Sequence, residues 1–144
     1  MPSDLMFKTS NTIHKAITML TFGRVGWSFG KMPVVELTTI GRKTGQERTV
    51  MLTSPLTDDG AVVVVASKGG DDDHPAWFLN LQFNPAVVVS VRGGPKQPMT
   101  ARVATADERA RLWPLVTAAY KGYAGYQTKT DREIPIVLLE ATAG

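Results

Sequence analysis

Three cations and two glycines fall within positions 41–48 of the chain, which read Gly-Arg-Lys-Thr-Gly-Gln-Glu-Arg. The segments 34–40 and 48–56 on either side are rich in β-branched residues, so the cations are predicted to lie on a tight turn between two strands. Glycine in such a turn permits a positive φ and lets a ligand approach the backbone closely. Cations held there favour a site for a phosphate or a carboxylate.

A second basic turn, residues 66–70 (Ala-Ser-Lys-Gly-Gly), follows a continuous apolar run at 61–66. Two glycine-bordered basic turns together indicate an anionic ligand that carries phosphate or carboxylate groups. The alternative is two ordinary hairpins whose lysines and arginines are solvated. The spacing of these residues alone does not decide between the two interpretations.

Five blocks, in order along the chain, resemble the signature of the deazaflavin-dependent nitroreductase family. The blocks are 37–46, 66–70, 75–81, 84–85 and a C-terminal block in which Tyr120, Tyr123 and Tyr126 are followed by 130–137. The match covers roughly residues 32 to 140. Members of the family resemble small split β-barrels of the flavin-reductase type and use the deazaflavin coenzyme F420 as a hydride carrier. The resemblance therefore implies an oxidoreductase that uses reduced F420.

The resemblance also implies which residues bind the coenzyme. F420 has a flat tricyclic ring, a phosphodiester and an anionic oligoglutamate tail, so its site needs cations at one end and an apolar slot at the other. The residues of this sequence at the matching positions are Arg42, Lys43, Thr44, Arg48, Ala66, Ser67, Lys68, Gly69, Trp77 and Asn80. The first turn would bind the tail and phosphate, and the second would border the ring. Trp77 and Asn80 would share a helix face beside the ring, although Trp77 is equally typical of a core residue.

A second group of side chains is expected to line the acceptor pocket. These residues are Thr53, Ala76, Tyr120, Tyr123 and Tyr126. Because the coenzyme supplies the hydride, the protein must position the acceptor, exclude water and provide a proton. Tyr126 is the candidate proton donor or orienting residue, and Ser67 is the second catalytic candidate. The alternative for the tyrosines is packing with surface hydrogen bonds.

Two positions depart from the family pattern. Several members carry a tyrosine where Thr53 stands and a larger side chain where Ala76 stands, so the acceptor side is reshaped here. The expected acceptor is an apolar conjugated molecule, namely a quinone, an activated alkene or a nitro compound. Two other interpretations stay open: the same fold binding flavin mononucleotide or haem, and a non-enzymatic F420 carrier or membrane-associated binding module.

The composition limits the chemistry further. The chain of 144 residues is long enough for one domain with its own core. It has no cysteine and two histidines, which excludes disulfides and thiolate sites and argues against a metal centre. The run 71–74 (Asp-Asp-Asp-His) is interpreted as helix-start chemistry instead of a metal cluster. No apolar stretch reaches the ~18 residues of a membrane span, so we expect a cytoplasmic protein.

Residues 1–31 form a basic arm with a net charge of +3, whereas the rest of the chain is neutral overall. Apolar residues recur within it at helical spacing, at Ile13, Ala16, Ile17 and Leu20. We favour a helix packed on the barrel. The alternatives are a lid over the acceptor or a membrane-surface helix that makes the protein peripheral to a membrane. Four cations are too few to indicate nucleic acid as a partner.

The remaining residues, 32–144, favour one small, mainly β cofactor-binding domain. Strands are predicted at 33–40, 48–56, 61–67, 86–92, 98–104 and 134–140, and a short helix at 75–83. Thr105 and Glu108 form a capping box for a later helix, which Pro114 is expected to break or restart. The predicted fold class is α+β, mainly β: a split β-barrel of the FMN-binding, flavin-reductase-like type with an N-terminal helix and short peripheral helices.

Overall fold

The computed structural model describes residues 28–29 and 32–142, so the helix predicted within the arm lies outside the described residues. The strands are β1 (Ser28–Phe29), β2 (Met32–Ile40), β3 (Glu47–Thr53), β4 (Leu56–Asp58), β5 (Ala61–Val65), β6 (Ala86–Val91), β7 (Gln97–Val103) and β8 (Ile136–Ala141). The helical elements are η1 (Lys68–Gly70), α2 (Ala76–Phe83), α3 (Ala106–Ala119) and α4 (Gly122–Thr128). Among these residues, no helix is long and apolar enough to cross a membrane.

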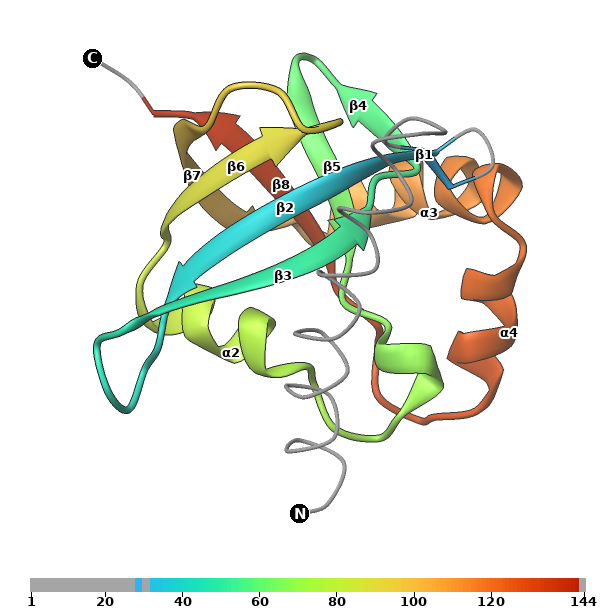
Figure 1. The fold of residues 1–144 in the computed structure, drawn as a ribbon. Helices are drawn as coiled ribbons and strands as arrows, with labels where there is room; N and C mark the ends of the chain where they lie inside the picture. Colours follow the sequence, from blue (N-terminus) through green and yellow to red (C-terminus); the bar gives the residue numbers. More distant parts are fainter. Residues whose placement is uncertain (1–27, 30–31, 143–144) are drawn as a thin grey trace.

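All strand pairs are antiparallel, and together they form one curled sheet (Figure 1). Its order is β1-β2-β6-β7-β8-β5-β4, and β3 pairs with β2 as a long hairpin. α2 lies beneath one end of this hairpin, and α3 and α4 lie at the other side of the molecule. β1 joins the sheet by pairing with the start of β2, although it falls in the segment assigned to the arm. The predicted mainly β, split-barrel fold is confirmed.

Two apolar clusters lie on opposite faces of the central strands. Val62 and Val64 of β5 belong to the cluster that contains Phe78 of α2. Val63, between them, belongs to the cluster that contains Leu112 of α3. Successive side chains of a strand point to opposite faces, so both faces of β5 are covered. All of β5 is accordingly buried, as its continuous apolar run predicts.

The single strand predicted at 48–56 is wrong, because the chain leaves β3 after Thr53 and begins β4 at Leu56. Ser54 lies at the break and is buried. Its hydroxyl donates to the carbonyl of Val63 at 2.6 Å and lies 2.9 Å from that of Leu56. A short side chain that bonds the backbone locally competes with the strand ladder, which accounts for the interruption.

Pro114 was expected to break or restart a helix, and this is also wrong, because α3 runs without interruption from Ala106 to Ala119. Leu112 and Val116, on either side of the proline, are fully buried, whereas Pro114 faces solvent. Burying two such side chains contributes about 1.5–3 kcal/mol each. Their combined contribution is therefore at least comparable to the penalty of about 3 kcal/mol for an interior proline. The burial of Leu112 and Val116 therefore keeps α3 helical at Pro114, a residue type that disfavours a helix interior.

The interpretation of Asp71, Asp72 and Asp73 as helix-start residues is wrong as well. α2 begins at Ala76 with Pro75 as its N-cap, and its first turn contains no acidic residue. The Asp71 carboxylate instead accepts a hydrogen bond from the Asp73 amide at 2.9 Å. The aspartates form a local turn before the helix, which is a common role of this residue type.

The predicted capping box is confirmed and is part of a charged network. The Thr105 hydroxyl accepts from the Glu108 amide at 3.2 Å, and the Glu108 carboxylate accepts from the Thr105 amide at 2.9 Å. Arg102 of β7 donates to both oxygens of the same carboxylate, at 2.7 and 2.8 Å, and to Glu140 of β8 at 3.0 Å. The hydrogen bond from Arg102, followed by that from Thr105, lowers the pKa of Glu108 to about 2.

We expect Glu108 to make the stability of the protein pH-dependent. Its folded-state pKa of about 2 lies below the ordinary value of 4.5, so its stabilisation is present above pH 4.5 and is lost as the pH falls toward 2. Urea unfolding midpoints should therefore fall more steeply with acidification for the native protein than for Glu108→Gln. Asp107→Asn, in the same helical turn, is the control for the loss of one acidic charge at the start of α3. If the urea midpoint changes with pH in the same way for all three proteins, Glu108 does not cause the pH dependence.

Candidate functional site

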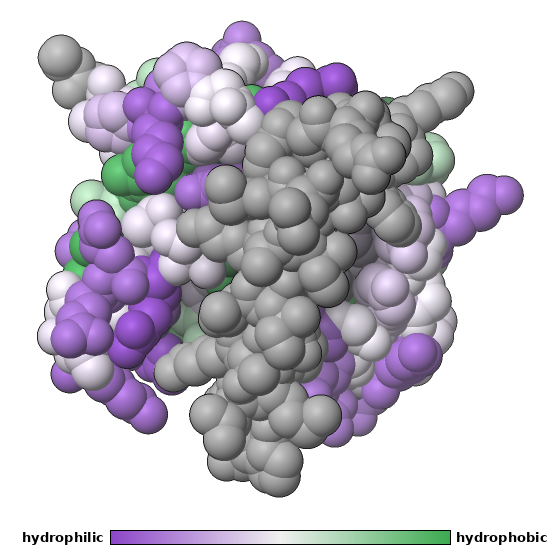
Figure 2. Space-filling view, in the orientation of Figure 1, coloured by the Kyte–Doolittle hydropathy of each residue, from purple (hydrophilic) through white to green (hydrophobic). Residues whose placement is uncertain are grey.

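The first basic turn closes the β2–β3 hairpin, as predicted. Lys43 and Arg48 are exposed on it, and the Thr44 hydroxyl accepts a hydrogen bond from the Gln46 amide at 3.2 Å. Gly45 has a φ of +73°, and a Cβ at this position would meet no atom within 4 Å. The turn thus needs glycine for its backbone and has open space beside it. Figure 2 shows a hydrophilic surface at this end of the molecule.

The hairpin is attached to α2 through one buried amide side chain. Asn80 is 4% exposed, and its carbonyl oxygen accepts from the Arg42 amide at 3.2 Å and from the Arg42 guanidinium at 2.9 Å. Its NH2 group donates to the Thr39 hydroxyl at 3.3 Å. Arg42 is therefore held against α2, whereas the other two cations of the turn extend outward. Asn80 supports the base of the hairpin, and its contact with a coenzyme stays a prediction.

The second basic turn is a short 3-10 turn, η1, that leads from β5 toward α2, and it is not a hairpin. Ala66 before it is buried, and Ser67 has right-handed helical angles. Lys68, Gly69 and Gly70 follow with φ values of 45°, 63° and 87°. A positive φ is uncommon for a lysine and stores strain, which often occurs at ligand sites. A right-handed residue followed by a left-handed one also turns successive amides toward one point, where they can bind an anion.

The second turn packs directly on α4. A Cβ at Gly70 would lie 2.7 Å from the carbonyl oxygen of Tyr126 and 3.1 Å from the side chain of Lys129. Only glycine fits such a close approach between two backbones. The turn predicted to border the coenzyme ring and the helix that carries two of the predicted acceptor residues are therefore neighbours.

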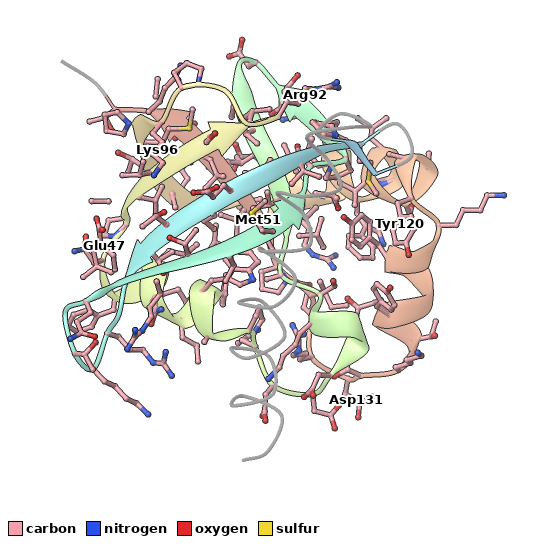
Figure 3. All side chains as sticks on the ribbon, viewed as in Figure 1. Glu47, Met51, Arg92, Lys96, Tyr120 and Asp131 are labelled. Carbon is pink, nitrogen blue, oxygen red and sulfur yellow. The ribbon has the colours of Figure 1, made fainter. Side chains whose placement is uncertain are left out.

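The three tyrosines form one aromatic cluster where α3 meets α4, the corner at which Figure 3 labels Tyr120. The ring centroid of Tyr120 lies 4.9 Å from that of Tyr123 and 6.4 Å from that of Tyr126, with tilted or edge-on rings. Gly122 makes room for this cluster, because a Cβ there would clash with the ring of Tyr120. Tyr123 is buried and bonds the Thr53 side chain at the end of β3. Four of the five predicted acceptor residues are thus brought together.

The pKa values of Tyr123 and Tyr126 are both raised above that of an ordinary phenol. The hydrogen bond with Tyr120, whose hydroxyl lies 3.4 Å away, and then burial raise the pKa of Tyr126. Burial is the main cause that raises the pKa of Tyr123, and the bond from Thr53 opposes it. Each is therefore a neutral hydrogen-bond donor at neutral pH.

Trp77 and Ala76 lie together in the first turn of α2. Trp77 is 7% exposed and belongs to the core cluster beneath the sheet, with its ring edge-on to Phe78 at 6.3 Å. Its packing role is thus visible, and its contact with a coenzyme stays a prediction. Ala76 is half-buried at the start of α2.

Three residues of the site were missed by sequence reasoning: Thr39, Gly122 and Arg132. In the sequence, Thr39 is typical of any threonine in a strand, and Gly122 is typical of a glycine before a helix, so neither pattern indicates a site. Arg132 stands between two acidic residues, which is typical of a solvated loop, yet its guanidinium is half-buried. No local pattern reports the long-range contacts of Thr39 and Arg132, and the need for glycine at position 122 follows from the orientation of the nearby Tyr120 ring. Across 28–29 and 32–142, no group of three or more metal-ligating side chains comes together.

Known proteins resemble this chain over most of its length. The family model of the F420H2-dependent quinone reductases matches residues 11–141. An F420H2-dependent quinone reductase of Mycobacterium tuberculosis is 42% identical over 132 residues, which is 88% of this chain and 87% of the relative. The solved structure of an F420-H2 dependent reductase (FDR-A) has a TM-score of 0.66 and 44% identity, covering 75% of this chain and 94% of that one. A domain-swapped dimer has a TM-score of 0.68 and 37% identity, covering 97% and 100%.

We expect replacement of Asn80 to loosen the first basic turn selectively. Asn80→Ala leaves the partly buried Arg42 amide without its acceptor, which costs up to about 1–3 kcal/mol. Hydrogen exchange of the amides at 41–46 should become faster, while exchange in β5 should follow global stability alone. Asn84→Ala is the matched control, because Asn84 follows the same helix but accepts only from the nearby Ala86 amide. Equal exchange at 41–46 in both variants would show that Asn80 does not hold the turn.

Proposed function

The chain belongs to the F420H2-dependent quinone reductase family, and we propose that it reduces a quinone-like acceptor held against its three tyrosines. Family membership makes the chain an F420H2-dependent oxidoreductase, with coenzyme F420 as its hydride carrier. The observation that carries the proposal is the direct packing of Gly70 on the backbone of Tyr126. It supports a site in which coenzyme and acceptor lie side by side, as hydride transfer requires.

The described residues fit an anionic coenzyme with a flat ring. Lys43 and Arg48 are exposed and can follow a flexible oligoglutamate tail. The amides of the second turn are suited to a phosphate or a polar ring edge, and a Cβ at Gly69 would meet no atom within 4 Å, so the backbone is approachable. We assign the tail to the first turn, and the ring to the second turn and the face of α2 that carries Trp77 and Asn80.

Reduced F420 supplies a hydride when bound, and the acceptor must gain this hydride and one proton to become a hydroquinone. The work of the chain is to orient the acceptor, exclude water and hold a proton at one acceptor oxygen. Tyr126 suits the last role because its raised pKa keeps the phenol protonated. The hydroxyl of Tyr120, 3.4 Å away, is a route by which that proton is replaced.

The tyrosine cluster also suits the shape of a quinone. Tilted aromatic rings provide flat apolar walls with polar tips, a combination that holds a flat ring with oxygen atoms at its edge. Thr53, which interacts with Tyr123, is smaller than the tyrosine that several family members carry at this position, so the acceptor side is reshaped here. We therefore propose a flat quinone-like acceptor for this pocket.

Loss of the hairpin cations should weaken F420 binding in proportion to the length of its tail. Each lost charge-assisted contact costs at most about 1.5–3 kcal/mol, and less at exposed positions such as these. We expect the Kd of Lys43→Ala/Arg48→Ala, measured by fluorescence titration of F420, to rise more for long tails than for short ones. Flavin mononucleotide added to the native protein should not displace the coenzyme.

Lys96→Ala, an exposed lysine on the β6–β7 turn, is the control for a general loss of positive charge and should leave the Kd unchanged. A loss that is independent of tail length would mean that Lys43 and Arg48 support the turn without contacting the tail. Displacement by flavin mononucleotide would contradict the coenzyme assignment.

Tyr126→Phe should lower kcat for quinone reduction by about 10²-fold while leaving the Kd of F420 unchanged, because it removes the proton donor alone. Tyr120→Phe should instead shift the alkaline limb of the pH–rate profile. The hydrogen bond with Tyr120 raises the pKa of Tyr126, so without it Tyr126 loses its proton, and activity falls, at a lower pH. Unchanged kcat in Tyr126→Phe would remove this residue from the reaction.

A further inference from the structure

Arg132, in the loop before β8, donates hydrogen bonds from its guanidinium to three main-chain carbonyls. Its Nε donates to the Asp71 carbonyl at 2.7 Å, and its two terminal nitrogens donate to those of Ser67 at 2.8 Å and Ala66 at 3.2 Å. These carbonyls lie before and after the left-handed residues of the second basic turn. The planar guanidinium therefore ties both ends of the turn to one point, which a lysine cannot do with its single nitrogen.

The backbone of Arg132 is in turn fixed to the tyrosine helix. Gln127 of α4 donates to the Arg132 carbonyl at 2.7 Å and accepts from the Ile134 amide at 2.9 Å. The Arg132 amide donates to the Thr130 hydroxyl at 3.2 Å. A continuous chain of hydrogen bonds thus runs from α4 through Arg132 to the second turn.

His74 completes the environment of the guanidinium. Its Nδ1 lies 3.1 Å from a terminal nitrogen of Arg132, and its ring lies 4.7 Å from that of Phe78 in α2. Burial, followed by the charge of Arg132, lowers the pKa of His74, while Asp73 opposes this shift. The imidazole is therefore neutral at neutral pH and accepts the hydrogen bond. Arg132 joins the turn to the segment before α2 as well as to α4.

We propose that Arg132 is a positioning residue that holds the second basic turn in its coenzyme-binding conformation and couples that turn to the tyrosine helix. The inference rests on the proposed function, which assigns this turn to F420. The turn contains three successive residues with positive φ, one of them Lys68. Such a strained conformation persists only where its surroundings hold it, and the three carbonyl bonds of Arg132 supply that restraint.

Arg132→Lys tests this proposal in the full chain, because it keeps the charge but loses most of the carbonyl bonds. We expect the Kd of F420 to rise about tenfold or more, and by the same factor for long and short tails, since the turn borders the ring. The tail-independent loss distinguishes Arg132 from Lys43 and Arg48. Hydrogen exchange of the amides at 67–71 should accelerate relative to those of β5.

Arg102→Lys is the matched control. Arg102 is also half-buried and its guanidinium also makes three hydrogen bonds, but these go to Glu108 and Glu140 and none goes to the turn or to α4. Its replacement should lower the melting temperature and leave the Kd of F420 unchanged. An equal rise of the Kd in both variants would overturn the proposal, because the effect would then be one of general stability.

An unchanged Kd of F420 in Arg132→Lys would also overturn the proposal, because charge alone would then suffice. A loss of affinity that grows with the length of the tail would overturn it as well. If Arg132→Lys does not fold, His74→Phe gives the same readout, since it removes one contact of Arg132 and keeps an aromatic ring beside Phe78. We expect a smaller, tail-independent rise there, and no rise would contradict the proposal. Failure of the native protein to bind F420 would instead overturn the proposed function.

Discussion

Burial of β5 and β8 on both faces is the constraint on which the rest of the structure depends. The side chains of β8 alternate between the two apolar clusters, with Val137 and Leu139 on one face and Ile136 and Leu138 on the other. A strand buried in this way needs a cover on each side. α2 covers one face and the α3–α4 pair covers the other. The connections at the ends of these strands must therefore lie between the two covers, which is where the second basic turn and the loop of Arg132 are found.

Two polar side chains connect the core to the two basic turns. Asn80 and Arg132 both place polar atoms in partly or fully buried surroundings, where an unsatisfied donor or acceptor costs about 1–3 kcal/mol. Each satisfies them with main-chain groups of a turn, Asn80 at the first and Arg132 at the second. The stability of the core is in this way coupled to the conformation of two turns that have little apolar packing of their own. Lys43 and Arg48, the cations that we propose bind the coenzyme tail, are exposed and add no such constraint.

Features that depend on neighbouring residues could be predicted from the sequence. The capping box of Thr105 and Glu108 is complete within four positions, and the hairpin at 41–48 is specified by glycines between two β-branched segments. The errors came where distant contacts override local preference. Pro114 stays inside a helix because Leu112 and Val116 are buried, and Ser54 interrupts a strand because the carbonyl of Val63, from another strand, lies within its reach.

The order of the five sequence blocks was enough to identify the family, the split-barrel fold and the coenzyme, because glycines, cations and aromatic residues at fixed spacing are local properties of the chain. Which side chains meet was decided only by folding. Thr53 reaches Tyr123, Asn80 reaches Arg42, and Arg132 reaches a turn more than sixty positions earlier in the chain. These contacts form between elements that the closure of the sheet brings together. The apolar run of β5 predicts its burial, but the two clusters that cover β5 and β8 come from distant elements, so no short segment of the sequence encodes the geometry of these contacts.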